Sequence, residues 1–422
     1  MILTLPMLAR AERPFAQLVN TVRQWLIWEN RYNPMQTRSL VPVTLDSALV
    51  PRDFVETRFL ESFPEQIRKS MLVEVAGKSY YRWIFHPDDR QYRDQVLNQI
   101  RQATGQEAVV ERHFIGYRTA SRSVVVHDPV TGAAFSLKTS TNRANGEWAD
   151  KAQPVRYAES AIIANEHVMA TEAELGRFDH LIVMRERGAV MMGSIDQAQI
   201  FRDLGSMGEG KSLHLPMFSI LSQKVMGEIM QANNLNVEQV IERVGEMWGR
   251  AQAEFVLKTG ISVSSAHSQN FLIELDLNKK FTGRIVFRDF ADSHLMREFV
   301  RGPIADRMLR HWESLRDKAN GIFKRSLTAS FMPYHGLDIE ANPLTDRIFA
   351  GTEKGFKAEM IRALGPWGYQ QWQLRVDQRP QTGSAMYLLN PVEGIGLNVD
   401  DVARRMRHGY SAFSCRRVHS GR

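Results

Sequence analysis

Polar residues that could bind a metal ion flank two consecutive predicted strands in the second half of the chain. Asn270 directly precedes a predicted strand over Phe271–Leu275, and Asp289 comes just after a second one over Arg284–Phe287. Because the outer ends of two strands joined by a turn lie side by side, we expect Asn270 and Asp289 to share one ion. An amide oxygen and a carboxylate suit Mg²⁺. Water and nucleotide phosphates would complete the coordination shell of the ion. Taken singly, nearby His267 could instead be a core histidine and Asp289 a strand-end cap.

Cationic residues accompany a second predicted hairpin upstream. Its strands are Val124–Val126 and Ala134–Leu137, and Arg122, Lys138 and Arg143 flank or follow them. Such a hairpin would project these side chains from a rigid sheet toward one cleft, where a triphosphate needs positive charge. For any one of them, solvated surface charge is the alternative.

One segment matches a phosphate-binding motif by its letters only. Gly205–Ser212 fits the pattern GxxxxGK[ST], which needs a buried strand before it and a helix that starts at the Lys-Ser pair. The preceding segment, Gln197–Leu204, is predicted to be a helix, and Pro216 interrupts the second turn of the helix that should follow. We therefore interpret the segment as a flexible glycine loop, which could cover a substrate.

The elements that must position these residues alternate between helix and strand. The first hundred residues are predicted to be mostly helical, with one strand pair near their end. The predicted helices cover 15–26, 52–71, 88–103 and 155–173, and a long one starts at Asn236, where Gln239 completes a capping box. The predicted strand pairs are 72–75 with 80–85 and 181–184 with 189–192. From about Ser293 onward the chain is again predicted to be mostly helical. This order predicts an α+β fold.

Length and composition bound the class of protein. A chain of 422 residues exceeds one ordinary core, and we expect a mostly helical region over 1–110, a β-rich region over 111–235 and a third region over 236–422 that holds the second hairpin. A net charge of +7 is mild and spread along the chain, which argues against nucleic-acid binding. Cys415 is the single cysteine, which excludes an internal disulfide and a cysteine-based metal cluster. We found no signal peptide and no long apolar run, so we expect a soluble, cytoplasmic protein without a membrane span.

At this point the residues resemble a known family. His267-Ser268-Gln269-Asn270 followed by Gly283–Asp289 resembles the paired HxQN and RD elements of the IucA/IucC family, the siderophore synthetases that are independent of nonribosomal peptide synthetases (NIS synthetases). Upstream, the family's SxRT, KLS and TSxxR elements resemble Arg122–Val126, Ser136–Lys138 and Thr141–Arg143. The resemblance covers about 114–292, and the chain would be a divergent and short member.

The resemblance implies a hand-like architecture of thumb, fingers and palm, in which ATP lies between fingers and palm and a polycarboxylate such as citrate lies beside it. It implies ATP and Mg²⁺ as cofactors, and adenylation of the carboxylate followed by condensation with an amine or hydroxyl. By the resemblance, Arg122, Lys138 and Arg143 bind phosphates or the carboxylate, and Lys138, Arg143 and His267 form the catalytic set. His267 contacts the acceptor carboxylate. Gln269 and Asn270 contact the nucleotide and the metal, and Asp289 binds Mg²⁺. The expected partners are small carboxylate, amine and alcohol substrates, and a homodimer is left open.

Two other readings remain open. A kinase-like phosphotransferase also places a histidine motif with an amide before a strand and a metal-binding aspartate, but no glycine-rich strand-turn lies upstream here. A noncatalytic relative would bind a nucleotide or metabolite and act through a partner. The second reading is motivated by the short chain and by Ala120, which stands where the family's first motif has serine.

Overall fold

The computed structural model describes residues 18–32, 39–119, 122–141, 152–263, 270–289, 293–295 and 343–378. The chain divides into two compact units. The first comprises Met1–Asn165 and Met184–Leu213, and the second comprises Glu166–Val183 and His214–Arg422. The division into three regions expected from the sequence stays a prediction.

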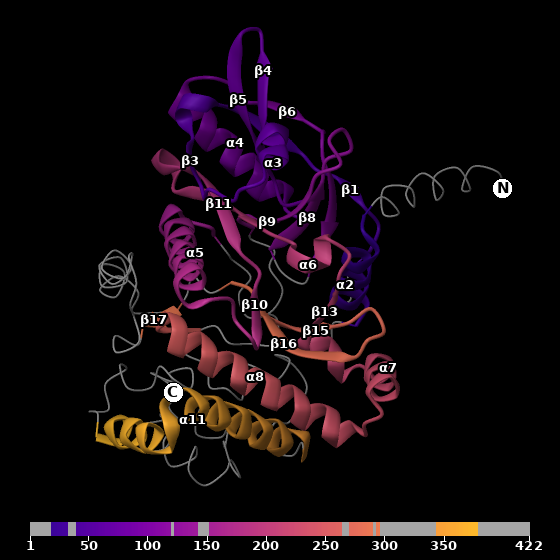
Figure 1. The fold of residues 1–422 in the computed structure, drawn as a ribbon. Coiled ribbons are helices and arrows are strands. Elements are labelled where there is room, and N and C mark those ends of the chain that lie inside the picture. Colours follow the sequence, from indigo (N-terminus) through magenta and orange to yellow (C-terminus); the bar gives the residue numbers. More distant parts are fainter. Residues whose placement is uncertain are drawn as a thin grey trace, which may run out of the picture. The chain divides into compact units, whose positions relative to one another are not determined.

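The first unit contains a seven-stranded antiparallel sheet of order β1-β7-β8-β9-β12-β11-β3. Five of its strands, β1, β3, β8, β9 and β11, are labelled in Figure 1. Its strands are β1 Val43–Thr44, β3 Glu56–Phe59, β7 Ile115–Arg118, β8 Ser123–His127, β9 Ala134–Lys138, β11 Glu186–Met192 and β12 Gln197–Arg202. Every residue of β12 is buried, and in β8 and β9 only the first residue is partly exposed. The middle of this sheet is therefore covered on both faces.

The predicted upstream hairpin is confirmed in β8 and β9. Ser123 lies opposite Lys138, and His127 lies opposite Ala134 next to the turn. The Asp128 carboxylate closes that turn because it accepts hydrogen bonds from the backbone N–H groups of Val130, at 2.8 Å, and of Thr131. The tight turn thus fixes the register of the two strands, and this register places Lys138 opposite Ser123 at the open end of the hairpin.

A second antiparallel sheet of the first unit has the order β4-β5-β2-β6, and it overturns the expectation that the first hundred residues are mostly helical. Its strands are β2 Ser47–Pro51, β4 Leu72–Val75, β5 Lys78–Ile84 and β6 Val109–Glu111. The pair of β4 and β5 was predicted. The first unit's helices are α2 Asn20–Arg31, η1 Arg52–Phe54, α3 Glu65–Met71, α4 Arg90–Thr104, η2 Gly193–Ile195, α6 Gly205–Gly208 and the first half of α5 Val155–Leu175.

The helix predicted over 52–71 is wrong for most of its length. Only η1 and α3 are helical there, and Glu56–Phe59 forms the edge strand β3 against β11. Pro64 is the N-cap of α3, which sets where the helix begins. The predicted helix near 88–103 is confirmed as α4: the Asp89 carboxylate accepts the Tyr92 N–H at its start, and Gly105 adopts the left-handed conformation at its end.

The second unit holds a four-stranded sheet of order β10-β16-β15-β13 and a separate pair of β14 and β17. The strands are β10 Leu181–Val183, β13 Leu213–Pro216, β14 Ile261–Val263, β15 Phe271–Leu275, β16 Phe281–Phe287 and β17 Ser293–Leu295. β15 and β16 form the predicted antiparallel hairpin, and β10 pairs with β16 in parallel. The helices are η3 Met217–Leu221, α7 Gln223–Asn233, α8 Val237–Thr259, α11 Pro343–Gln378 and the second half of α5.

The pairing predicted between 181–184 and 189–192 is wrong. β10 belongs to the sheet of the second unit, whereas β11 pairs with β12 and β3 in the first unit. The helix predicted over Gln197–Leu204 is also wrong, because the central strand β12 occupies Gln197–Arg202. Beyond Ser293, β17 and α11 are described, and the other residues of that predicted helical region lie outside the described part.

The long helix α8 begins and packs as its sequence predicts. Asn236 and Gln239 form a reciprocal capping box at its start, and Gly260 ends it in the left-handed conformation. α8 packs along α11 (Figure 1). A Cβ atom on Gly249 of α8 would lie 2.1 Å from the Thr352 carbonyl oxygen, and one on Gly355 of α11 would lie 2.1 Å from the Glu246 carbonyl oxygen. Glycine therefore lets the two helix backbones touch.

The described residues combine helices with mainly antiparallel sheets, which confirms the predicted α+β class. Among the described helices, none combines the length and the apolar character needed to cross a bilayer.

Candidate functional site

The predicted magnesium ligands lie at the open end of the hairpin of β15 and β16. Phe271 and Phe287 lie opposite each other as the last pair of the ladder, and beyond them the Arg288 N–H donates to the Asn270 carbonyl oxygen at 3.0 Å. Asp289 follows directly. The structure thus brings the backbones of Asn270 and Asp289 to the same end of the ribbon, as the strand pattern predicts.

This end of the hairpin rests on packed aromatic rings. The Phe271 and Phe287 rings meet edge to face at 4.8 Å, Phe287 meets Phe255 of α8 at 5.3 Å, and Phe271 meets Trp248 of α8 at 5.6 Å. All four side chains are almost fully buried. A rigid apolar base therefore supports the polar residues beyond it.

Asp289 adopts a left-handed backbone conformation, with φ of 63°. Among residues other than glycine, aspartate and asparagine tolerate this region best, whereas a residue such as alanine is strained there by about 1–2 kcal/mol. Asn270 is only 5% exposed and Asp289 is half-buried. One amide and one carboxylate fit Mg²⁺, because this ion binds few protein oxygens and keeps water or phosphate as its other ligands.

The predicted cationic residues of the first unit gather at the open end of the hairpin of β8 and β9. Arg122 directly precedes Ser123, whose partner in the ladder is Lys138. The Arg122 Nη1 donates to the Ala152 carbonyl oxygen at 2.6 Å, just before α5 begins. Lys138 is 5% exposed and also lies opposite Ile200 of β12. The structure therefore places Arg122 and Lys138 at the same end of the interior strands β8 and β9.

A buried polar cluster follows Lys138, and sequence reasoning missed it. The Ser140 hydroxyl donates to the Gln197 Oε1 at 3.0 Å and accepts the Gln153 N–H at 2.6 Å. The same Gln197 oxygen accepts from the Tyr92 hydroxyl at 2.8 Å. This cluster fixes the course of the chain as it leaves β9 and again just before α5 begins. The Thr-Ser-Thr run after a strand was its only sequence signal, because Tyr92 and Gln197 come from distant segments.

The other predicted site residues, Arg143, His267 and Gln269, lie outside the described residues, and their roles stay predictions. The described residues contain no group of three or more histidine, cysteine, aspartate or glutamate side chains that could hold a metal ion. Of the predicted residues that are described, Arg122 and Lys138 belong to the first unit and Asn270 and Asp289 to the second.

The structure also rejects a phosphate-binding loop at Gly205–Ser212, and of the two reasons given by the sequence only the missing helix after Lys211-Ser212 is confirmed. A strand precedes the segment, as the motif requires, but the strand β13 and not a helix follows the Lys211-Ser212 pair. The segment forms the short helix α6 and a turn, in which the Ser206 and Ser212 hydroxyls lie 2.8 Å apart. Without a helix start at Lys211, there is no amide cradle for phosphates.

Comparison with known proteins supports the predicted fold. The chain is similar to aerobactin synthetase IucC from a hypervirulent pathotype of Klebsiella pneumoniae, with a TM-score of 0.56 and 13% identity over 87% of this chain and 70% of that chain. It is also similar to the petrobactin biosynthesis protein AsbB from Bacillus anthracis strain Sterne, with a TM-score of 0.57 and 14% identity over the same shares. No family model matches the sequence, and no curated protein matches it significantly. The two structures confirm the predicted resemblance to NIS synthetases at the level of the fold.

Proposed function

We propose that this protein is an ATP-dependent synthetase that adenylates a carboxylate, such as citrate, and condenses it with an amine or a hydroxyl in siderophore biosynthesis. The fold shared with two NIS synthetases supports the class of protein. The observation that supports the proposal is the end of the hairpin of β15 and β16, where the backbones of Asn270 and Asp289 lie at the positions of the HxQN and RD motifs.

In the proposed reaction a carboxylate oxygen attacks the α-phosphorus of ATP, and the bond to pyrophosphate breaks. An amine or hydroxyl then attacks the acyl carbon, AMP leaves, and the proton of the nucleophile passes to solvent or to a nearby base. Two anions must approach each other in the first step, so neutralising their charge is the main task of the protein.

The residues of this chain divide that task. Lys138 and Arg122, at one end of the strands β8 and β9, hold phosphate or carboxylate oxygens. Their positive charge reduces the repulsion between the two anions. Asn270 and Asp289 would hold Mg²⁺, which supplies further neutralisation of the phosphate charges. Arg143, His267 and Gln269 complete the proposed set. No covalent protein nucleophile is needed, and the substrates are small carboxylates with amines or alcohols, used in the cytoplasm.

Nucleotide products test the proposal. The full chain would be incubated with ATP, Mg²⁺ and a panel of polycarboxylates and amines, and the nucleotides would be separated. We expect AMP and pyrophosphate in equal amounts, dependent on one carboxylate of the panel. ADP and phosphate would contradict adenylation and favour a kinase-like phosphotransferase. Binding of ATP without turnover of any acid would instead favour a noncatalytic relative.

A further inference from the structure

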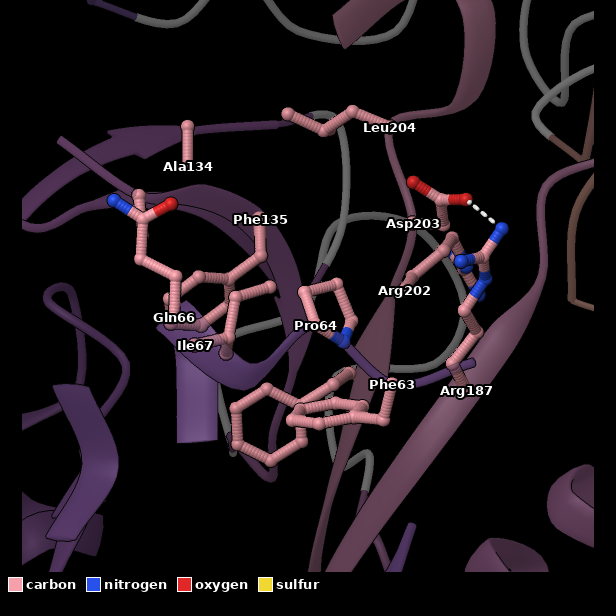
Figure 2. Close-up of a pocket in the computed structure, with 12 residues that line it drawn as sticks. Phe63, Pro64, Gln66, Ile67, Ala134, Phe135, Arg187, Arg202, Asp203 and Leu204 are labelled. Carbon is pink, nitrogen blue, oxygen red and sulfur yellow. Dashed lines mark ion pairs between the residues drawn. The ribbon is translucent and has the colours of Figure 1, made fainter. Parts of the chain in front are cut away.

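A small cavity in the first unit lies away from the residues of the proposed reaction. It has a volume of about 140 Å³, is partly open to solvent, and is lined by residues from the start of α3, the start of β9, β11 and the end of β12 (Figure 2). Lys138 lies at the other end of β9, and at about 3.4 Å per residue the strand separates it from Ala134 by roughly 14 Å. The cavity is therefore a separate site.

One wall of this cavity consists of aromatic rings that pack against one another. The rings of Phe63 and Phe201 meet edge to face at 5.6 Å, and those of Phe135 and Phe201 lie 5.4 Å apart. Ile67 and Ala134 complete this surface. Each of the three rings is at most 5% exposed, so the wall is already formed and needs no rearrangement to receive a ligand.

Gly188 explains why one of these rings can lie where it does. A Cβ atom at this position would come within 2.6 Å of the Phe63 ring. Glycine on β11 therefore leaves room for the Phe63 ring, which lines the cavity.

The charges around the cavity cancel. Arg187 pairs with Asp203 at 2.7 Å, as the dashed line in Figure 2 marks, and Arg202 pairs with Glu186 at 2.6 Å. A charged ligand would lose its hydration without finding an unmatched opposite charge, so the site favours a neutral one.

Arg187 offers a polar contact to such a ligand. Arg187 donates from Nη1 to the Ser62 carbonyl oxygen at 3.1 Å and holds Asp203 with Nη2, whereas its buried Nε–H donates to no atom of the described residues. A buried donor without an acceptor is costly, and an oxygen on the ligand would satisfy it.

From these observations we propose that the cavity binds a neutral ligand the size of a benzene ring that carries one hydroxyl or carbonyl oxygen, with phenol as the simplest probe. An apolar cavity of about 150 Å³ is known to take benzene, which matches this volume. The ring would lie among Phe63, Phe135 and Phe201, and its oxygen would accept the Arg187 Nε–H. The proposal does not depend on the adenylation reaction.

Titration calorimetry on the full chain at pH 7 tests the proposal. We expect saturable binding of phenol with a Kd on the order of 1 mM, as suits a ligand of few atoms, and at least fivefold weaker binding of benzene and of benzoate. Ala134→Leu fills the cavity and should raise the Kd for phenol at least tenfold. Ala134→Val adds a smaller side chain and should raise this Kd less. Val130→Leu, at an exposed turn position before β9, is the matched control and should bind as the wild type does.

Arg187→Met tests the polar contact, because it keeps the length of the side chain and removes the donor. This variant should bind phenol and benzene alike. Thermal melting checks that each variant folds. If Ala134→Leu does not fold, Ala134→Val tests whether filling the cavity weakens the binding of phenol. The proposal is overturned if the wild type shows no saturable binding of phenol, if both Ala134 variants bind it as tightly as the wild type, or if benzoate binds best.

Discussion

Single residues at the open ends of the two hairpins carry the proposed chemistry. Lys138 ends β9 opposite Ser123, and Asp289 follows β16 in a left-handed conformation. Lys138 is the last residue of β9 and Asp289 comes two residues after β16, so buried strands fix the backbone that leads to both side chains.

Replacing Lys138 by methionine should remove positive charge without emptying the space that the side chain fills. We expect kcat/KM for the adenylation to fall roughly 100-fold, as is typical when one donor to developing charge is lost. Lys78→Met, at an exposed position of β5, is the control and should leave activity unchanged. Steady-state kinetics measure both variants, and an active Lys138→Met with normal KM for ATP and acid would remove Lys138 from the site.

His214 predicts how stability depends on pH. This residue of β13 is fully buried, and because burial disfavours the charged imidazolium, its pKa falls to about 4 from the ordinary 6.5. Between these values the unfolded chain binds a proton that the folded chain does not, so stability is lost as the pH falls from 6.5 to 4.

Between pH 6.5 and 4, the titration of His214 lowers the free energy of unfolding by about 3 kcal/mol. Urea unfolding of His214→Leu should show a pH dependence in this range that is flatter by about that amount. An unchanged slope between pH 6.5 and 4 would show that other groups carry the acid sensitivity.

At the scale of elements, close contact between α8 and α11 depends on glycine. Gly249→Ala would place a methyl group 2.1 Å from the Thr352 carbonyl oxygen and 2.7 Å from the Phe356 nitrogen, and backbone atoms cannot move aside as side chains do. We expect this variant to lower the free energy of unfolding by about 1–3 kcal/mol. Chemical denaturation measures the change.

Gly227→Ala on α7 is the matched control for Gly249→Ala. No atom lies within 4 Å of its Cβ position, and alanine favours helix more than glycine does. This variant should be neutral or more stable by up to about 1 kcal/mol. If both variants unfolded alike, close packing of α8 and α11 would not contribute to stability.

Elements with local signals could be predicted from the sequence, and elements set by distant partners could not. The turn at Asp128 and the capping box at Asn236 lie within a few residues, and the hairpin and helix beside them were predicted correctly. β12 was missed because half of its residues, Gln197, Gln199 and Arg202, are polar although the structure buries them. Their partners include Tyr92 and Glu186, which no local pattern reveals.

The two strands β10 and β11 show the same limit. They are close in sequence, and Gly188 lies near the start of β11, so the two segments resemble a hairpin. β10 instead pairs with β16, about a hundred residues further along, and this pairing is visible only in the folded chain. For the candidate site, the hairpin of β15 and β16 was predictable, whereas the hydrogen bonds of Ser140 with Gln153 and Gln197 were not.

At the scale of the whole molecule, the fold is shared with IucC and AsbB at 13–14% identity. Such divergence preserves an arrangement of elements without preserving most side chains, so fold alone does not define the reaction. The activity must be tested on the residues that the fold positions.

Trapping of an activated acid tests the central claim most directly. The full chain would be incubated with ATP, Mg²⁺, citrate or another acid of the panel, and hydroxylamine, which converts an acyl-adenylate to a hydroxamate. Asp289→Asn is the informative variant, because asparagine tolerates the left-handed backbone and removes only the charge. Asp94→Asn, which changes a largely exposed carboxylate of α4, is the matched control.

We predict that the wild type and Asp94→Asn form hydroxamate together with AMP, and that Asp289→Asn forms it at least 100 times more slowly. Hydroxamate formation at the wild-type rate by Asp289→Asn would contradict the proposed site. No hydroxamate from any acid of the panel, with ATP left intact or converted to ADP, would contradict adenylation itself.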